Sequence, residues 1–290
     1  GVKKLSVTYP KTTTIVIEAA FHLIQEGLLN VPDTGTLNVK QARAFLWNAA
    51  WLQDYMITKW NAASPLNMPR DKPFDNLHLV IMGPGGTGKT AVLKLTEALT
   101  THFAGPETVR KLAPSNAAAR LLGGDTIHAL CKLPFGNKVT LTSKKGRLRK
   151  PALQQHRRKW ATAIAAYLDE VSMIPSDQFL QCDVRLRQAK IIPMQPFGGL
   201  AMNICGDFLQ LPPVDKDGSR RSLAMTLDNF GRPSPDEGEH DDDDANNRSD
   251  PRVSAEPVEV LSEARQGYEL WTSLKRVVCL TVNVRAPDVL

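Results

Sequence analysis

Apolar residues recur at helical spacing near the start of the chain. The pattern runs over residues 14–29 and again over 39–60, and proline, asparagine or glycine follows each stretch. Side chains three and four positions apart share one face of a helix, and the punctuating residues end that helix. Residues 1–76 are therefore predicted to form a helical N-terminal region.

Short apolar runs take over from residue 77. The first run is LHLVIM at 77–82, and later ones occupy 109–113, 164–168, 200–205 and 277–282. Stretches with helical spacing lie between them, at 89–103, 116–122 and 176–189. Short buried strands that alternate with helices are typical of a parallel sheet covered by helices on both faces. The fold class predicted for residues 77–290 is therefore α/β.

The composition changes between residues 215 and 257. Asp, Gly, Ser, Pro and Arg dominate this segment, and four consecutive aspartates stand at 241–244. Because few apolar residues are available for burial, we expect a disordered insertion in the α/β domain. Three roles stay open for the insertion: an idle solvated loop, a regulatory segment, or a segment whose acidic run imitates DNA.

Charge is distributed unevenly along the chain. The net charge of the 290 residues is +6, but residues 236–250 contribute −7, so the remainder carries +13. A basic body suits a polyanionic partner. Residues 138–159 hold nine Lys or Arg side chains and no Asp or Glu. This basic stretch is either a solvated surface insertion or a patch that contacts phosphates.

Composition also excludes several classes of protein. The chain has no run of 18 apolar residues and no apolar leader, so we expect neither a membrane span nor secretion, and an intracellular location. The cysteines are far apart and form no CxxC pair, which argues against a disulfide framework or a structural zinc site. We expect all four to be reduced core residues: Cys131, Cys182, Cys205 and Cys279.

The sharpest motif is GPGGTGKT at 83–90, which fits the pattern GxxxxGK[ST]. It follows an apolar strand and opens a helix, so backbone N–H groups of the loop and of the helix N-terminus can surround a phosphate. Lys89 is predicted to reach the β- and γ-phosphates as a catalytic residue, and Thr90 to hold Mg²⁺. The residues predicted to bind the nucleotide are Gly83, Pro84, Gly85, Gly86, Thr87, Gly88, Lys89 and Thr90.

Two carboxylates follow another predicted strand. The run at 164–168 leads directly into Asp169 and Glu170. Ligands of open parallel sheets bind at the carboxyl ends of the strands. Asp169 is therefore predicted to bind Mg²⁺ together with Thr90, through water, and Glu170 to polarise the attacking water.

Four motifs, in their order along the chain, resemble a known family. They are the glycine-rich loop, APSNAAARLLGGDTIHAL at 113–130, YLDEVSMI at 167–174 and PFGGLAMNICGDFLQLPPV at 196–214. Together they are similar to the first motor half of superfamily 1B DNA helicases of the petite-integration-frequency type, and to relatives encoded by Helitron transposons. The resemblance is dense over 77–214 and thin over 261–288. It implies a RecA-like P-loop NTPase domain that uses ATP and Mg²⁺ and contacts single-stranded DNA.

The resemblance also implies roles for residues inside these motifs. Gln210 would sense the γ-phosphate and couple it to the DNA, and Asp207 would orient the Mg²⁺ shell or a neighbouring backbone. The candidate DNA contacts are Ser115, Asn116, Thr126 and His128. Their hydroxyl, amide and imidazole groups suit phosphate contacts that read no bases. For His128, a purely structural role stays equally open.

Two weaker similarities flank this core. LNVKQARAF at 37–45 is similar to the glutamine motif of the family, which implies that Gln41 contacts the adenine. Because 42 residues separate Gln41 from Gly83, a role as a helix surface residue stays open. The segment LWTSLKRVVCLTVNVRAPD at 270–288 resembles the strand leading into the arginine motif, so Arg285 would reach the γ-phosphate. Ala286 stands where the family usually has Gln.

Aromatic residues offer few stacking platforms for bases. Trp47, Trp51 and Trp60 recur at helical intervals among apolar neighbours, which favours core packing. Phe135 and Phe208 are the better candidates for stacking.

A helicase motor of this superfamily closes two RecA-like lobes on ATP, and only the first lobe is expected between Gly1 and Leu290. The chain is thus interpreted as a monomeric piece of an ATP-dependent 5′-to-3′ DNA helicase of the nucleus or mitochondrion, whose second lobe belongs to a longer protein. Two alternatives stay open. One is a catalytically inactive nucleic-acid-binding remnant, and the other is a P-loop ATPase that acts on another substrate.

Overall fold

The structure is a computed structural model. It describes residues 16, 18–20, 37–63, 76–134, 140–141, 147–210, 212–213, 222–224 and 258–284. Four of the predictions above lie outside the described residues: most of the helix at 14–29, the acidic run, Phe135 and Arg285. The side chain of Trp60 also lies outside them.

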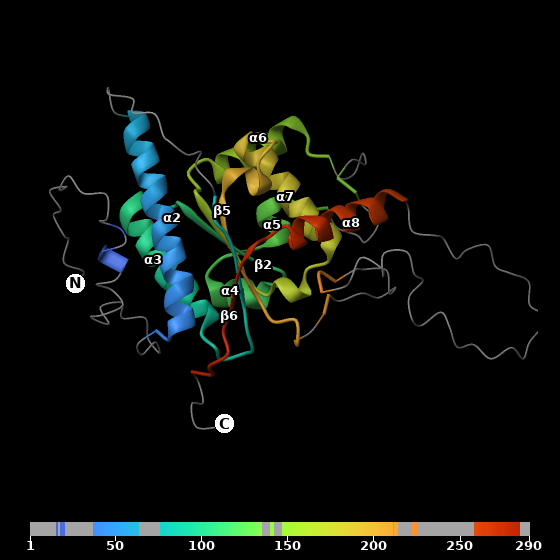
Figure 1. The fold of residues 1–290 in the computed structure, drawn as a ribbon. Coiled ribbons are helices and arrows are strands. Elements are labelled where there is room, and N and C mark those ends of the chain that lie inside the picture. Colours follow the sequence, from blue (N-terminus) through green and yellow to red (C-terminus); the bar gives the residue numbers. More distant parts are fainter. Residues whose placement is uncertain are drawn as a thin grey trace, which may run out of the picture.

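A parallel sheet forms the centre of the molecule (Figure 1). Its strands in the described part of the chain are β1 (His78–Met82), β2 (Val109–Ala113), β3 (Asp125–Thr126), β4 (Ala165–Leu168), β5 (Ala201–Gly206) and β6 (Arg276–Cys279). Their order is β3-β2-β4-β5-β1-β6, and every neighbouring pair is parallel. All carboxyl ends therefore lie at one edge of the sheet, where the predicted site residues follow the strands.

Helices cover both faces of this sheet (Figure 1). On one face lie α2 (Val39–Ala63) and α3 (Lys89–Ala104), and α4 (Asn116–Leu122) adds Leu122 to the same apolar layer. On the other face lie α5 (Ile127–Cys131), α6 (Lys150–Trp160), α7 (Ser176–Lys190) and α8 (Val258–Thr272). Short 3-10 turns, η1 (Val171–Met173) and η2 (Pro196–Gly199), complete the described elements.

The apolar spacing of the helices explains this sandwich. Phe45 and Leu52 of α2 are completely buried with Leu93 of α3 against the first face of the sheet. Phe179 and Leu186 of α7 are equally buried against the second face. The central strands β1, β4 and β5 are covered on both sides, so they read as almost continuous apolar runs. Burial of these side chains from water is the main force that holds the layers together.

The predicted α/β class, with a parallel sheet covered on both faces, is confirmed. The expected strands at 77–82, 109–113, 164–168 and 200–205 correspond to β1, β2, β4 and β5. The run at 277–282 forms β6, which ends earlier, at Cys279. The expected helices at 39–60, 89–103, 116–122 and 176–189 correspond to α2, α3, α4 and α7. None of the described helices is both long enough and apolar enough to cross a membrane.

Core packing is confirmed for two of the three tryptophans at helical intervals. Trp51 is buried and stacks on Tyr55, with ring centroids 5.6 Å apart, and Trp47 packs against the same apolar layer. Phe208, a candidate for stacking on bases, packs edge-to-face against Trp271, with ring centroids 5.6 Å apart.

Two predictions about exposure meet described residues that differ from them. Of the segment 215–257, expected to be a disordered insertion, the structure describes residues 222–224 alone, where Ser222 pairs with Pro175 and Leu223 is 1% exposed. One apolar side chain is enough to bring this short piece into the core beside α7. Cys279 is exposed, unlike the other three cysteines, because it occupies the edge strand β6.

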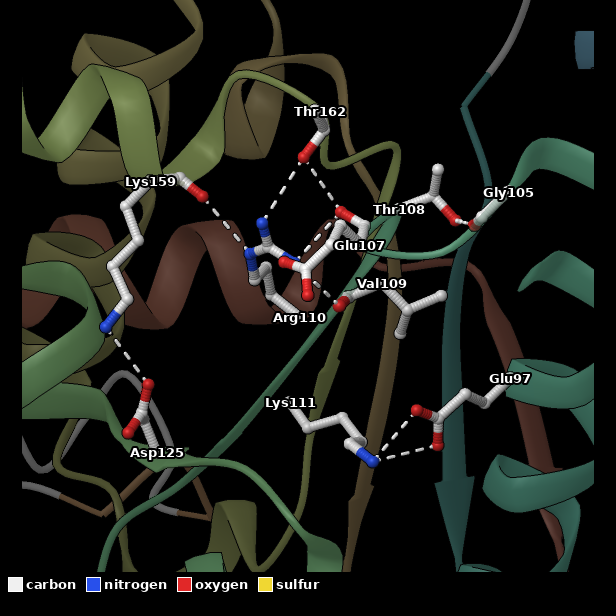
Figure 2. A network of polar contacts seen from close by, with 10 residues as sticks. All are labelled: Glu97, Gly105, Glu107, Thr108, Val109, Arg110, Lys111, Asp125, Lys159 and Thr162. Atoms are coloured by element: carbon white, nitrogen blue, oxygen red, sulfur yellow. Dashed lines mark hydrogen bonds and ion pairs between the residues drawn. The ribbon is translucent and has the colours of Figure 1, made fainter.

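A network of ion pairs and hydrogen bonds fastens β2 to its neighbours (Figure 2). The guanidinium of Arg110 bonds the carboxylate and carbonyl of Glu107, the carbonyl of Lys159 and the hydroxyl of Thr162. Lys111 pairs with Glu97 of α3 at 2.9 Å. The network borders an open cavity of about 560 Å³. The cations of this network are paired within the protein, so we assign it a structural role: it holds β2 against α3 and against the segment at Lys159 and Thr162.

Candidate nucleotide-binding site

The glycine-rich loop joins β1 to α3 at the carboxyl edge of the sheet. Gly86 and Gly88 both have a φ of +84°, a conformation that favours glycine. A Cβ atom at Gly88 would also lie 2.3 Å from Nε2 of Gln41. Helix α3 begins at Lys89, directly after Gly88 of the loop. The N–H groups of its first turn have no partner within the helix and therefore point at the loop. The loop therefore has the conformation that a phosphate-binding turn requires.

Lys89 is the first residue of α3, and its side chain folds over the loop. Its Nζ donates hydrogen bonds to the carbonyl oxygens of Gly83 and Pro84, the latter at 3.1 Å. Thr87 is buried, and its hydroxyl donates to the same Pro84 carbonyl at 2.8 Å. The ammonium group thus lies at the mouth of the loop, where an anion would meet it.

Asp169 and Glu170 follow β4 at the same edge. Asp169 is 9% exposed, and its Oδ1 accepts the N–H of Glu170 at 2.9 Å. Burial raises the pKa of Asp169 above its usual value, while the N–H of Glu170 and the charge of Lys89 oppose this rise. Burial also raises the pKa of Glu170, and the charge of Asp169 raises it further. The two carboxylates and Lys89 therefore form one electrostatic cluster.

The backbone around these carboxylates is constrained. Glu170 has a φ of +54°, in the left-handed region that non-glycine residues seldom adopt. Such strain in a surrounded backbone is common at functional sites. It turns the chain sharply between β4 and η1, so that Glu170 stays half-buried beside Asp169.

The segment Asp207–Gln210 follows β5, the strand between β1 and β4. Asp207 is 6% exposed, and its Oδ1 accepts the N–H of Leu209 at 3.0 Å. The N–H of Gln210 donates to the Asp207 carbonyl, which closes a tight turn. A Cβ atom placed at Gly85 would lie 3.5 Å from Nε2 of Gln210. The amide of Gln210 therefore reaches the glycine-rich loop.

Gln41 also lies against the loop. It is 4% exposed, and its Nε2 donates to the carbonyl of Thr87 at 2.9 Å. Its Oε1 accepts the N–H of Asn38, while Asn38 Oδ1 accepts the N–H of Gln41, which forms a capping box at the start of α2. The alternative of an exposed helix surface residue is therefore wrong. Asn38 was not singled out from the sequence, although the N-x-x-Q spacing of a capping box contains that signal.

The segment after β6 completes the surroundings of the loop. Val284 N–H donates to the Gly86 carbonyl at 3.0 Å, and a Cβ atom at Gly86 would lie 2.6 Å from Oδ1 of Asn283. Lys40 of α2 donates to the hydroxyl of Thr281. Arg285, predicted to reach the γ-phosphate, lies outside the described residues and directly follows Val284 in the chain. Asn283 has no recognisable signal in the sequence.

The four candidate DNA contacts lie on two neighbouring turns at the same edge. Ser115 caps α4 and accepts the N–H of Ala118, and Thr126 caps α5 and accepts the N–H of Ala129. The turns are adjacent because Ala113 pairs with Thr126 between β2 and β3. Asn116 is exposed and His128 is half-buried. Strands β4 and β5 separate these turns from β1 and its glycine-rich loop.

A family model described as PIF1-like helicase matches residues 75–229, which is more than half of the chain. The chain therefore belongs to the PIF1-like helicase family. The ATP-dependent DNA helicase PIF1 of Saccharomyces cerevisiae is 36% identical over 140 residues, which cover 48% of this chain and 16% of that protein. The protein of the same name from Xenopus laevis is 33% identical over 144 residues, covering 49% and 21%.

The chain is also similar to solved structures of Pif1 helicases. A crystal structure of the Pif1 helicase from Bacteroides with ADP-AlF3 and single-stranded DNA has a TM-score of 0.42 and 28% identity, covering 57% of this chain and 34% of that one. The chain thus spans about a fifth of the length of the curated relatives named above and a third of this solved structure.

Proposed function

We propose that this chain is the ATP-binding and ATP-hydrolysing motor lobe of a DNA helicase. One observation carries the proposal: the glycine-rich loop, the Asp169 and Glu170 pair and the Gln210 turn follow three strands that are neighbours in the sheet, β1, β4 and β5. A nucleotide on the loop would therefore lie within reach of all three groups. The curated relatives are named ATP-dependent DNA helicases, which supports the same assignment.

The loop fits a nucleoside triphosphate. The backbone conformation of Gly86 and Gly88, together with the N-terminus of α3, supports binding of the phosphates by N–H groups. Lys89 would leave the carbonyls of Gly83 and Pro84 and neutralise the β- and γ-phosphates. All residues from Gly83 to Thr90 are thus proposed nucleotide contacts.

Oxygen ligands for Mg²⁺ are present beside the loop. Thr90 supplies a hydroxyl in the first turn of α3, and Asp169 supplies a buried carboxylate whose charge Lys89 alone does not balance. This donor set fits a hard divalent cation, and Thr90 and Asp169 are the residues that would hold it. When bound, the ion would neutralise charge on the phosphates.

Glu170 is the proposed general base. A carboxylate whose pKa is raised by burial is a stronger base than an exposed one, and so it polarises an attacking water more effectively. Gln210 is proposed to bond the γ-phosphate oxygen or that water without adding charge. Gln41 is proposed to contact adenine, and Arg285 to stabilise charge at the γ-phosphate, as the family resemblance implies.

Single-stranded DNA is proposed to lie on the two turns that begin α4 and α5. The hydroxyl groups of Ser115 and Thr126 accept backbone N–H groups, so their own protons remain available for phosphate oxygens. Asn116 and His128 add an amide and an imidazole to the same edge. Contacts of this kind position a strand without reading its sequence.

The whole protein is proposed to be a 5′-to-3′ helicase that acts on DNA in the nucleus or mitochondrion, with a second lobe that completes the motor. The chain alone is expected to act as a monomer and to hydrolyse ATP slowly. The second lobe would supply an arginine donor in addition to Arg285, and the lack of such a donor lowers the rate by roughly 10³ or more. Strand separation by this chain alone is not expected.

The test is ATP hydrolysis by the 290-residue chain with and without single-stranded DNA, beside Lys89→Ala and Glu170→Gln. The proposal predicts stimulation by DNA that both variants lose. Nucleotide binding should survive in Glu170→Gln, because this variant keeps the loop and its lysine. DNA binding without turnover in the unmodified chain would instead support an inactive nucleic-acid-binding remnant. Turnover that DNA never stimulates would support an ATPase with another substrate.

A further inference from the structure

Helix α8 lies beyond the residues that the family model matches, and it packs along α7. The two helices are in close contact at Gly267, where a Cβ atom would lie 1.7 Å from the carbonyl oxygen of Ser176. Near its start, Glu263 accepts hydrogen bonds from Gln181 of α7 and from the backbone of Leu141. These contacts fix the position of α8 on the second face of the sheet.

The last turn of α8 carries Trp271, which lies between two phenylalanines. Its ring meets Phe179 of α7 edge-on, with centroids 5.8 Å apart and an angle of 86°. It meets Phe208 in the same way, at 5.6 Å and 79°. Edge-to-face pairs of this kind are attractive beyond the burial of their area. Trp271 therefore links the buried Phe179 to the turn that carries Gln210.

Phe208 is the apolar anchor of that turn. Leu209 is 91% exposed and Gln210 is exposed, so neither side chain holds the segment against the core. Asp207 holds the backbone from one side, through the N–H groups of Leu209 and Gln210. The ring of Phe208 packs against the apolar layer on the second face of the sheet, and it meets Trp271 there edge-to-face.

We propose that Trp271 is a positioning residue for Gln210. By holding Phe208, it keeps the turn in the conformation that directs the Gln210 amide toward the glycine-rich loop. The inference rests on the proposed role of Gln210 at the γ-phosphate. It assigns to α8, a helix outside the matched region, a part in distinguishing a nucleoside triphosphate from a diphosphate.

The test compares two affinities measured with Mg²⁺ on the full chain: that for a non-hydrolysable ATP analogue and that for ADP. Trp271→Ala should weaken binding of the analogue about three- to tenfold, which is the range expected for loss of the edge-to-face pair that holds Phe208. Binding of ADP should stay unchanged, because ADP lacks the γ-phosphate. Trp271→Phe, which keeps a ring beside Phe208, should restore most of the preference. Leu270→Ala, another apolar truncation in α8, is the control for general loosening of the helix.

Gln210→Ala tests the proposed role of Gln210 separately from that of Trp271. If it weakens the analogue selectively and Trp271→Ala adds nothing to it in the double variant, the inference holds. If Gln210→Ala is selective but Trp271→Ala leaves the preference unchanged, the inference is wrong and the role of Gln210 stands. Equal losses for both nucleotides in Trp271→Ala and Leu270→Ala would reduce Trp271 to a structural residue. If Gln210→Ala has no selective effect, the proposed role of Gln210 fails and the inference fails with it.

Discussion

The side-chain amide of Gln41 donates a hydrogen bond to the carbonyl oxygen of Thr87 at 2.9 Å, which joins the first turn of α2 to the glycine-rich loop. The other half of the amide accepts the N–H of Asn38. Oε1 and Nε2 of this buried side chain each make one of these two hydrogen bonds. Helix α2 therefore supports the loop directly, and the N-terminal region is part of the candidate site.

Removing this contact is expected to affect both stability and nucleotide binding. Gln41→Ala should lower the free energy of unfolding by about 1–3 kcal/mol, because it leaves the half-buried N–H of Asn38 and the buried carbonyl of Thr87 without their partner. It should also weaken ADP binding, since the loop loses a fixed support. Asn38→Ala is the matched control, because it removes the helix cap, worth about 1 kcal/mol, and leaves the contact with Thr87. Urea denaturation and ADP titration measure the two effects. Equal ADP affinity in both variants would contradict the role assigned to Gln41.

A second buried amide contact joins α2 to the sheet. Asn48 and Asn203 exchange two hydrogen bonds, at 2.9 and 2.7 Å, between α2 and the completely buried strand β5. Asn48→Ala or Asn203→Ala alone should lower the free energy of unfolding by about 1–3 kcal/mol, because each leaves the other buried amide without its partner. Replacing both by leucine, which is similar in size, should cost less than either alanine variant. Denaturation curves of the three variants test this. A double leucine variant that loses as much stability as the two alanine variants together would contradict it.

The two acidic site residues are expected to make stability depend on pH. Burial raises the pKa of Asp169 and of Glu170 in the folded state, so their ionisation costs stability as the pH rises through these folded values. Asp169→Asn and Glu170→Gln should therefore raise the melting temperature at pH 8. The gain should shrink as the pH falls toward about 4, where the unfolded carboxyls are also protonated. A gain that is constant from pH 8 to 4 would show that the effect does not come from ionisation.

The parts of the fold with a clear apolar period could be predicted from the sequence. The run at 77–82 and the glycine-rich loop after it predict a strand, a turn and the start of α3, and the structure has all three. Helix α6 could not be predicted in the same way, because charged and polar residues dominate it. Only His156 and Trp160, four positions apart, are buried. A charged surface hides the period on which such predictions depend.

The candidate site was predictable only where its chemistry is local. Lys89, Asp169 and Glu170 follow strands whose carboxyl ends must meet in a parallel sheet, so their proximity follows from the order of elements. The contacts of Asn283 with Gly86 and of Trp271 with Phe208 join residues about 200 and 60 positions apart. No local pattern encodes such pairs, because they depend on how the layers pack.

The cysteines are expected to differ in reactivity. Cys279 is exposed. The hydrogen bond with Cys182, together with burial, raises the pKa of the Cys131 thiol, and burial raises the pKa of the Cys205 thiol, which lowers the thiolate fraction of both. Cys182 is buried, with its Sγ 3.3 Å from that of Cys131. A thiol reagent should therefore label one cysteine in the native chain and all four after unfolding. Peptide mapping of the native sample should identify Cys279, and rapid labelling of Cys131 would contradict the packing of α5 on α7.

The most direct test of the account is calorimetric titration of the folded chain with ATP and Mg²⁺, beside Lys89→Ala and a chain in which Thr90 and Asp169 are replaced by alanine and asparagine. We expect one binding site, a large loss of affinity in Lys89→Ala, and loss of the Mg²⁺ dependence in the double variant. Well-folded chain that binds no nucleotide, or that binds it equally well without Lys89, would contradict it.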